Sequence, residues 1–305
     1  MSNGIAVDAL MPPEMAEKIE GIGVKKAGLD FWSMFGLAIL AGAFIALGGE
    51  FSTLVTTKSG LGFGMNRLVG GLAFSLGLIL VVIAGAELFT GNNLIVIAWV
   101  SGKVSLGQLM RNWLIVYFGN LVGSLITVML MYLTRQWSLE GYSVGVTALN
   151  TANAKVSLAF ADALARGIMC NALVCLAVWL CLSARGVVDK ILAIVFPITA
   201  FVASGFEHSV ANMYFIPLGI LLKEEPEVLK AAGKTAADLA NLNWQGFLVG
   251  NLLPVTIGNI FGGGFMVALV YWFIYRRLHV GKQYGLKQVV ELFVGSPTNQ
   301  EEPKQ

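Results

Sequence analysis

One histidine stands in the middle of a long apolar stretch of the chain. His208 lies in the polar, glycine-containing segment 203–212, and the residues on both sides of that segment are apolar. An ionisable side chain at membrane depth is costly and is a functional hypothesis by default. Its ordinary pKa of about 6.5 lets it change charge near neutral pH. The alternative is a structural histidine that is hydrogen-bonded in the protein core.

A second polar segment, 84–93, interrupts an apolar stretch in the first half of the chain. Thr90 is the matching position there, and its hydroxyl could donate to an anion or to His208; the alternative is a helix cap. Glu87 and Glu207 are equivalent acids beside these two positions. We expect the acids to cap backbone N–H groups or to tie the loops, rather than to contact a substrate.

Two buried asparagines recur in one short pattern. The sequence GN, two apolar residues and G occurs at 119–123 and again at 258–262. Asn120 and Asn259 could brace the interrupted segments or line a path, and Asn171 is in a comparable position. A single buried asparagine usually joins helices, so both readings stay open.

The composition is that of an integral membrane protein. Of 305 residues, 56% are hydrophobic and 12% are charged, and the mean hydropathy is +0.75. The net charge of +2 gives no reason to expect nucleic acid binding. Three cysteines in one apolar run and two histidines give no disulfide framework, no metal site and no cofactor site.

Six stretches are apolar and long enough to span a bilayer. They lie at 31–49, 67–101, 108–133, 160–182, 187–221 and 247–276. The second and fifth are too long for one crossing and contain the two polar segments, so we predict two broken helices. Three spans in each half require the second half to be inverted. The predicted fold is an all-α membrane domain of two inverted three-helix repeats, and this arrangement is typical of a transport site near the midplane.

The predicted organisation has three parts. Residues 1–30 form an amphipathic N-terminal segment with a helix near 13–27, at the membrane surface or on a neighbouring subunit. Residues 31–277 form the channel domain, with repeats 31–133 and 160–277, and 278–305 form a polar tail. Six spans place both termini on one side, and that side carries twelve of the 20 basic residues. The bias predicts cytoplasmic termini and an inner-membrane location.

These stretches resemble the formate/nitrite transporter family, and most closely its formate channels. The resemblance runs from about 8 to 277. It is carried by DALMPPEMA (8–16), GMNRLVGG (64–71), AELFT (86–90), NWLIVYFGN (112–120), CLAVW (175–179), PVTIGN (254–259) and above all ASGFEHSVANM (203–213).

The resemblance implies an aquaporin-like homopentamer in the bilayer, with one pore in each subunit that passes small monovalent anions, formate foremost. We expect His208 to meet the anion and exchange a proton with it, which makes the anion a neutral acid that crosses apolar constrictions cheaply. The resemblance raises Asn259 as a partner of His208. It also makes Lys155, in the connection 150–155, a residue that concentrates anions. The apolar constrictions that it implies are formed by Phe74, Leu78, Leu88, Phe89, Val174 and Phe201.

Three alternatives stay open at this point. The protein could be an obligate proton–anion symporter, or its substrate could be nitrite, hydrosulfide, lactate or acetate. A membrane enzyme that uses Glu207 and His208 as a general base is the third. Neither a GxSxG nor an HExxH motif is present in the sequence, so we do not expect an enzyme.

Overall fold

The computed structural model describes residues 9–278, and every regular element in that range is a helix. Six helices are long and apolar enough to cross a membrane, as predicted. They are Phe31–Thr56, Phe63–Gly85, Leu106–Leu133, Phe160–Ser183, Val187–Ser204 and Gly246–Tyr275. The predicted tail 278–305 lies outside the described residues except for its first position.

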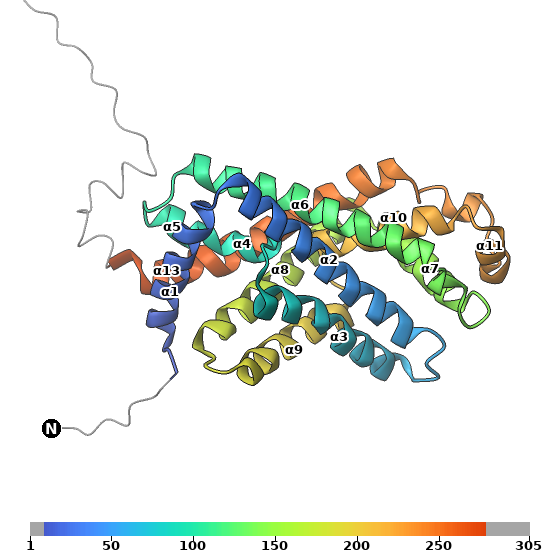
Figure 1. Ribbon diagram of the computed structural model, residues 1–305, viewed down its shortest axis with the longest axis horizontal. Helices are drawn as coiled ribbons and strands as arrows, with labels where there is room; N and C mark the ends of the chain where they lie inside the picture. The colour runs from blue at the N-terminus through green and yellow to red at the C-terminus, as the bar shows by residue number, and fades with distance from the viewer. Residues whose placement is uncertain (1–8, 279–305) are drawn as a thin grey trace, which may run out of the picture.

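The helices follow in this order along the chain (Figure 1): α1 (Pro12–Ala27), α2 (Phe31–Thr56), α3 (Phe63–Ile79), the π-helical η1 (Leu80–Gly85), α4 (Phe89–Asn92), the short 3₁₀ turn η2 (Asn93–Ile95), α5 (Val96–Val100), α6 (Leu106–Leu133), the 3₁₀ turn η3 (Gln136–Ser138), α7 (Ser143–Val156), α8 (Phe160–Ser183), α9 (Val187–Ser204), α10 (Ser209–Leu222), α11 (Pro226–Ala232), the 3₁₀ turn η4 (Ala237–Leu239), the π-helical η5 (Gly246–Leu252), α12 (Leu253–Ile260), the π-helical η6 (Phe261–Leu269) and α13 (Val270–Tyr275).

The second and fifth spans are broken helices, as predicted. The first interruption falls between η1 and α4, and the second falls between α9 and α10. Each break begins with a glycine at positive φ, Gly85 at 84° and Gly205 at 72°. That conformation costs a residue with a Cβ more than it costs glycine, which explains why both polar segments carry a glycine at this point.

The two halves pack alike. In the first half α2 packs on α3 and α6, and in the second half α8 packs on α9, α12 and η6. The helices α3 and α9 join the halves along the lower edge of Figure 1. The glycines of the two GN motifs make close packing possible, because a Cβ on Gly123 would collide with the Ile39 carbonyl and one on Gly262 with the Ile168 carbonyl.

Two predictions about the outer elements need correction. Lys155 does not lie in a loop but in the last turn of the helix α7. The predicted N-terminal helix exists as α1, but Met15, Ala16 and Ile19 are buried against the same chain, mainly against η2 and α5. The helices α1 and α7 lie at opposite ends of the long axis in Figure 1.

Candidate functional site

His208 and Thr90 meet between the two broken helices. Thr90 Oγ1 lies 2.9 Å from His208 Nε2, and the two side chains are 0% and 3% exposed. His208 is also the N-cap of α10, because its Nδ1 accepts the Ala211 N–H at 3.0 Å. Since Nδ1 is an acceptor, a neutral His208 carries its proton on Nε2 and donates it to Thr90. The Thr90 hydroxyl proton is then available to an anion.

Thr90 is not the residue that matches His208 in the other half. Asn120 Oδ1 accepts the Phe89 N–H at 2.9 Å, and Asn259 Oδ1 accepts the Ser209 N–H at 2.9 Å. These equivalent bonds align Phe89 with Ser209 and therefore Leu88 with His208. Thr90 lies two residues further along, in the short helix α4 that begins at Phe89.

The motif asparagines brace the breaks. Asn259 Nδ2 donates to the carbonyls of Gly167 at 2.8 Å and Glu207 at 3.0 Å. Asn120 Nδ2 donates equivalently to Ala38 and Glu87 at 2.8 and 2.9 Å. Both amides are 0% exposed. Of the two roles left open above, these contacts favour the brace.

Asn171 joins the two breaks. Its Nδ2 lies 2.7 Å from the Asn259 carbonyl and 3.2 Å from both the Thr90 carbonyl and Asn93 Oδ1. The side chain is 0% exposed. It therefore holds the Thr90 backbone in place rather than facing open space.

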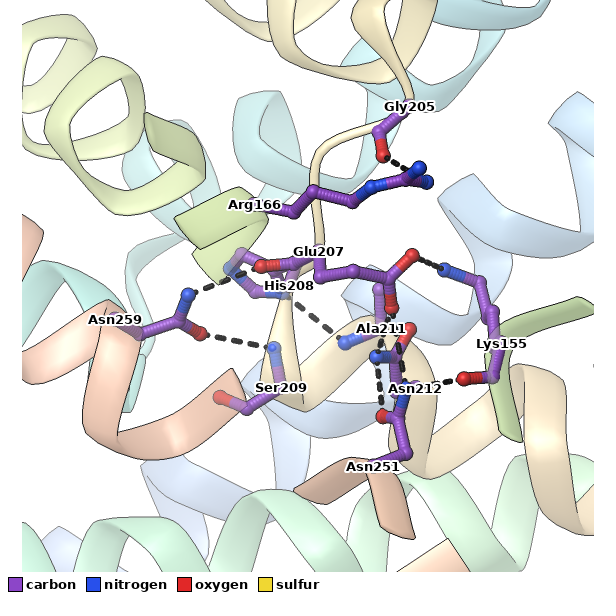
Figure 2. A network of polar contacts seen from close by, with 10 residues as sticks. All are labelled: Lys155, Arg166, Gly205, Glu207, His208, Ser209, Ala211, Asn212, Asn251 and Asn259. Atoms are coloured by element: carbon purple, nitrogen blue, oxygen red, sulfur yellow. Dashed lines mark hydrogen bonds and ion pairs between the residues drawn. The ribbon is translucent and has the colours of Figure 1, made fainter. Parts of the chain in front are cut away.

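Lys155 is paired with Glu207 in a buried polar cluster (Figure 2). The Nζ–Oε1 distance is 2.9 Å, and Asn212 donates to the same carboxylate at 2.6 Å. Asn212 also donates to Asn251 at 2.7 Å. Glu207 thus ties the break to α7, as expected for a carboxylate with a structural role.

An equivalent cluster lies in the first half, around a lysine that the sequence reading did not select. Lys26 Nζ lies 2.5 Å from Glu87, and Asn92 donates to Glu87 at 2.7 Å and to Asn112 at 2.9 Å. The helix α1 therefore corresponds to α7. The separation from lysine to glutamate differs, at 61 residues in one half and 52 in the other. The spacing from each lysine to the next span is the same, because the pattern K-x-x-L-x-F recurs at 26–31 and 155–160.

Two cavities approach the centre from opposite sides. The Lys155 vestibule, of about 460 Å³, is lined by Lys155, Glu207, His208, Phe74 and Phe201 among others. The Lys26 vestibule, of about 660 Å³, is lined by Lys26, Glu87, Leu78 and Leu88 among others. Both contain a lysine–glutamate pair at equivalent places.

An apolar layer separates the vestibules. Phe74 and Phe201 pack edge to face with ring centroids 5.6 Å apart on the side of the Lys155 vestibule, and Phe201 stacks on His208. Leu78 and Leu88 bound the Lys26 vestibule. All four side chains are 2–3% exposed. These residues are where a constriction was expected.

The lining of the two vestibules does not include two further residues of the expected constriction, and their role there stays a prediction. Phe89 packs against Tyr117 and Trp113, with ring centroids 4.9 and 6.1 Å away, and lines neither vestibule. Val174 is buried and also lines neither of them. Phe89 follows Leu88 directly, and adjacent residues at the start of a helix point in different directions.

Comparison with known proteins gives one consistent result. Residues 13–273 match the family described as Formate/nitrite transporter. The formate channel FocA of Escherichia coli (strain K12) is 48% identical over 273 residues, which cover 88% of this chain and 96% of that protein. The formate channel FocA of Haemophilus influenzae is 42% identical over 264 residues, with 86% and 93% covered.

A solved structure described as a pentameric formate channel with formate bound has a TM-score of 0.76 and 48% identity. It covers 80% of this chain and 97% of its own. A second, described as an FNT family ion channel, has a TM-score of 0.74 and 30% identity and covers 86% and 98%. The aligned sequence, the six spans and the paired breaks lead to one conclusion: this chain belongs to the formate/nitrite transporter family.

Proposed function

We propose that this protein is a formate channel that works as a homopentamer in the bacterial inner membrane. One observation carries the proposal: the donor pair His208–Thr90 lies where an apolar layer separates two lysine-bearing vestibules. Its relatives FocA of E. coli and H. influenzae are named formate channels, and the similar solved structure is a pentameric formate channel.

Each part of the path has a separate task. Lys155 and Lys26 raise the concentration of anions at the two vestibules. The apolar layer excludes hydrated ions, because an ion that enters it loses water without a replacement. Thr90 donates its hydroxyl proton to the carboxylate at the centre, and His208 holds the Thr90 oxygen from the other side. A small carboxylate that also takes up a proton crosses as a neutral acid.

Proton exchange at His208 involves the end of a helix. Nε2 already carries the proton of the neutral ring, so a second proton enters at Nδ1. Nδ1 then becomes a donor that faces the Ala211 N–H, and the α10 cap is lost. The Ala211 bond therefore favours a second candidate mechanism, in which His208 stays a neutral donor and the anion takes its proton from water in a vestibule.

The sidedness follows from charge. We propose that both termini are cytoplasmic and that the Lys26 vestibule, which α1 lines, opens to the cytoplasm. The bias of basic residues toward the side of the termini supports this orientation.

The decisive experiment is flux from liposomes that contain the purified pentamer. Formate, nitrite, hydrosulfide and chloride are compared at an external pH of about 5 and of about 7.5, on either side of the ordinary histidine pKa. We expect fast formate flux that rises on acidification. Preference for nitrite or hydrosulfide would change the substrate and keep the site. A folded pentamer that passes no formate would overturn the proposal.

The variant His208→Asn separates the two candidate mechanisms. Asparagine is a good N-cap and can still accept the Ala211 N–H, but it does not titrate. Proton exchange at His208 predicts that the variant loses the rise in flux on acidification. A variant with the wild-type pH profile would leave the neutral-donor mechanism.

A further inference from the structure

We propose that Arg67 and Arg166 form a carboxylate-binding subsite in the Lys155 vestibule, before the Phe74–Phe201 constriction. The inference rests on the proposed passage of formate. The subsite would take a small planar monovalent carboxylate, because the guanidinium group offers a rigid fork of N–H donors that matches two carboxylate oxygens.

The two arginines meet the same short turn. Arg67 Nε donates to the Ala203 carbonyl at 2.8 Å, and Arg166 Nη1 lies 3.5 Å from the Gly205 carbonyl. Both side chains line the Lys155 vestibule. Within residues 9–278 these are their hydrogen bonds to protein, so each guanidinium, with five N–H groups, has donors left for a ligand.

Gly205 leaves room for this arrangement. A Cβ at this position would lie 2.7 Å from Arg67 Nη2. The absence of a side chain lets the guanidinium lie over the turn, directly at the entrance of the break. Glycine at position 205 therefore serves two purposes: it allows the positive φ of the turn, and it leaves space for the Arg67 guanidinium.

The neighbouring acid does not neutralise the arginines. Glu207 already accepts Lys155 at 2.9 Å and Asn212 at 2.6 Å. In Figure 2 Arg166 passes beside Glu207 and reaches the Gly205 carbonyl, with no interaction drawn between the two side chains. The vestibule therefore keeps two positive charges beyond its ion pair.

Comparison of the two halves shows whether the turn needs the arginines in order to form. The Leu37 carbonyl accepts the Glu87 N–H at 3.2 Å, as the Arg166 carbonyl accepts the Glu207 N–H at 3.3 Å, so Leu37 corresponds to Arg166. Arg67 precedes Gly85 by 18 residues, and the residues 18 and 17 positions before Gly205 are Val187 and Val188. A valine is therefore the counterpart of Arg67 whether or not the extra residue of the π-helical η1 is counted. The other break therefore forms with leucine and valine at these positions. The two arginines are therefore not a requirement of the turn.

The test replaces the arginines with their counterparts. The double variant Arg67→Val with Arg166→Leu is reconstituted, and formate flux is measured as a function of concentration at low and high salt. We expect the half-saturating formate concentration to rise by roughly fivefold, as for loss of a partly exposed ion pair, and the salt dependence to flatten. Arg135→Gln is the control, because Arg135 stacks on Trp137 and does not line the vestibule.

A second readout does not depend on flux. Saturation-transfer NMR with ¹³C-formate on the pentamer in nanodiscs reports binding directly, and we expect the signal to fall in the double variant and to stay in Arg135→Gln. Wild-type protein that binds formate but does not pass it would contradict the proposed function and leave the subsite. An unchanged half-saturation and an unchanged NMR signal in a folded pentamer would overturn the subsite. Arg166→Gln, whose exposed side chain has one long hydrogen bond, serves if the double variant does not assemble.

Discussion

His208 performs two tasks at once, and they compete for its two ring nitrogens. Nδ1 satisfies a backbone N–H at the start of α10, and Nε2 faces Thr90. A helix cap is worth about 1 kcal/mol, so protonation of Nδ1 carries a conformational cost in addition to the cost of a buried charge. The ring is therefore held in one orientation and one protonation state while the site is empty.

Thr90 provides the test of this arrangement. Thr90→Ala removes the hydroxyl that we propose donates to the anion, and it also removes the acceptor of the His208 Nε2–H group. We expect formate flux to fall by at least roughly tenfold, because tenfold corresponds to about 1.4 kcal/mol and a hydrogen bond to a charged group contributes about 1.5–3 kcal/mol. Thr90→Ser keeps the hydroxyl and should retain most of the flux. Wild-type flux in the alanine variant would reduce Thr90 to a structural residue.

Sequence reasoning reached part of the centre. It selected His208, because an ionisable residue within an apolar span is visible in the sequence. It also paired Glu87 with Glu207, which the equivalent hydrogen bonds of the two carboxylates support. It misaligned Thr90 with His208 by two residues, because it paired them as polar side chains. The equivalent hydrogen bonds of Asn120 and Asn259, which fix the alignment, are visible only in the structure. The arginine pair was missed, although Arg166 lies inside the predicted span 160–182, because the sequence does not show that Arg67 and Arg166 meet the same turn.

At the scale of elements, the GN motif is a contact between helices. Gly123 lets α6 approach α2, and Gly262 lets the start of η6 approach α8, each against a backbone carbonyl. Close approach through glycine is typical of membrane helices, where small residues allow tight van der Waals packing. The recurrence of the motif therefore reflects a recurring helix pair.

Alanine at either motif glycine should destabilise the pentamer. In Gly123→Ala and Gly262→Ala the new methyl group meets backbone that cannot turn aside, and overpacking of this kind costs about 1–3 kcal/mol. We expect a lower unfolding temperature by fluorescence-detected melting in detergent. Gly264→Ala is the matched control, because its Cβ would meet Val96 Cγ2 at an ordinary 3.4 Å. Equal melting of all three variants would contradict the packing argument.

The helix α1 is held by a buried carboxylate. Glu20 is 0% exposed and accepts Ser101 Oγ at 2.6 Å and Arg276 Nη2 at 3.1 Å, and it also pairs with Lys103. Burial alone would raise the pKa of Glu20, but the hydrogen bonds with Arg276, Lys103 and Ser101 outweigh it and lower the pKa below its ordinary 4.5.

The sign of this shift sets a pH window. A lowered pKa contributes stability that is fully present above the ordinary value of 4.5 and is lost as the pH falls below it. We expect the protection factors of the α1 amides, which correct for the pH dependence of intrinsic exchange, to stay high from about pH 8 to pH 5 and to fall below about pH 4.5. Glu20→Gln leaves Arg276 and Lys103 without their carboxylate. We expect it to lower the free energy of undocking α1 at neutral pH by about 3–5 kcal/mol, the cost of breaking a buried ion pair by removing one partner.

Glu17→Gln is the control for this prediction. Its carboxylate is 3.9 Å from Arg276 and 73% exposed, so its loss should leave exchange in α1 unchanged. Release of α1 near pH 6 in the wild type would show that a group other than Glu20 controls its docking.

The sequence predicted the helices and their breaks better than it predicted which helices of the two halves are equivalent. Apolar length and glycine position are local properties, and they predicted both interruptions. The equivalence of α1 with α7 was missed although K-x-x-L-x-F recurs at 26–31 and 155–160. Three shared positions are a weak signal, and only the folded chain shows that Lys26 and Lys155 reach equivalent glutamates. The π-helical segments η1, η5 and η6 were also not foreseen, because an extra residue in a helical turn leaves little trace in hydropathy.

At the scale of the whole molecule, two vestibules and one apolar layer define how an ion experiences the membrane potential. The vestibules together occupy more than 1,000 Å³, so the field falls mainly across the layer between Phe201 and Leu78. A unit charge gains about 2.3 kcal/mol per 100 mV. A neutral acid gains nothing.

Voltage therefore identifies the species that crosses the layer. We expect formate flux into liposomes to be nearly independent of a potential imposed with potassium and valinomycin, because a bare anion between Phe74 and Leu78 has lost its water. Chloride leak through an unrelated pore is the positive control for the imposed potential. Flux that changes several-fold with about 50 mV would mean that formate crosses as the anion.

The equivalence of α1 and α7 has a consequence for the ancestry of this architecture. The unit that was duplicated must include the short lysine-bearing helix as well as three spans, since each half needs its own lysine to pair with Glu87 or Glu207. Such a unit would have had to insert in both orientations and pair with its own inverted copy before the two genes were fused. Arg67 and Arg166, which have a valine and Leu37 as counterparts, are positions at which the two copies of the unit differ.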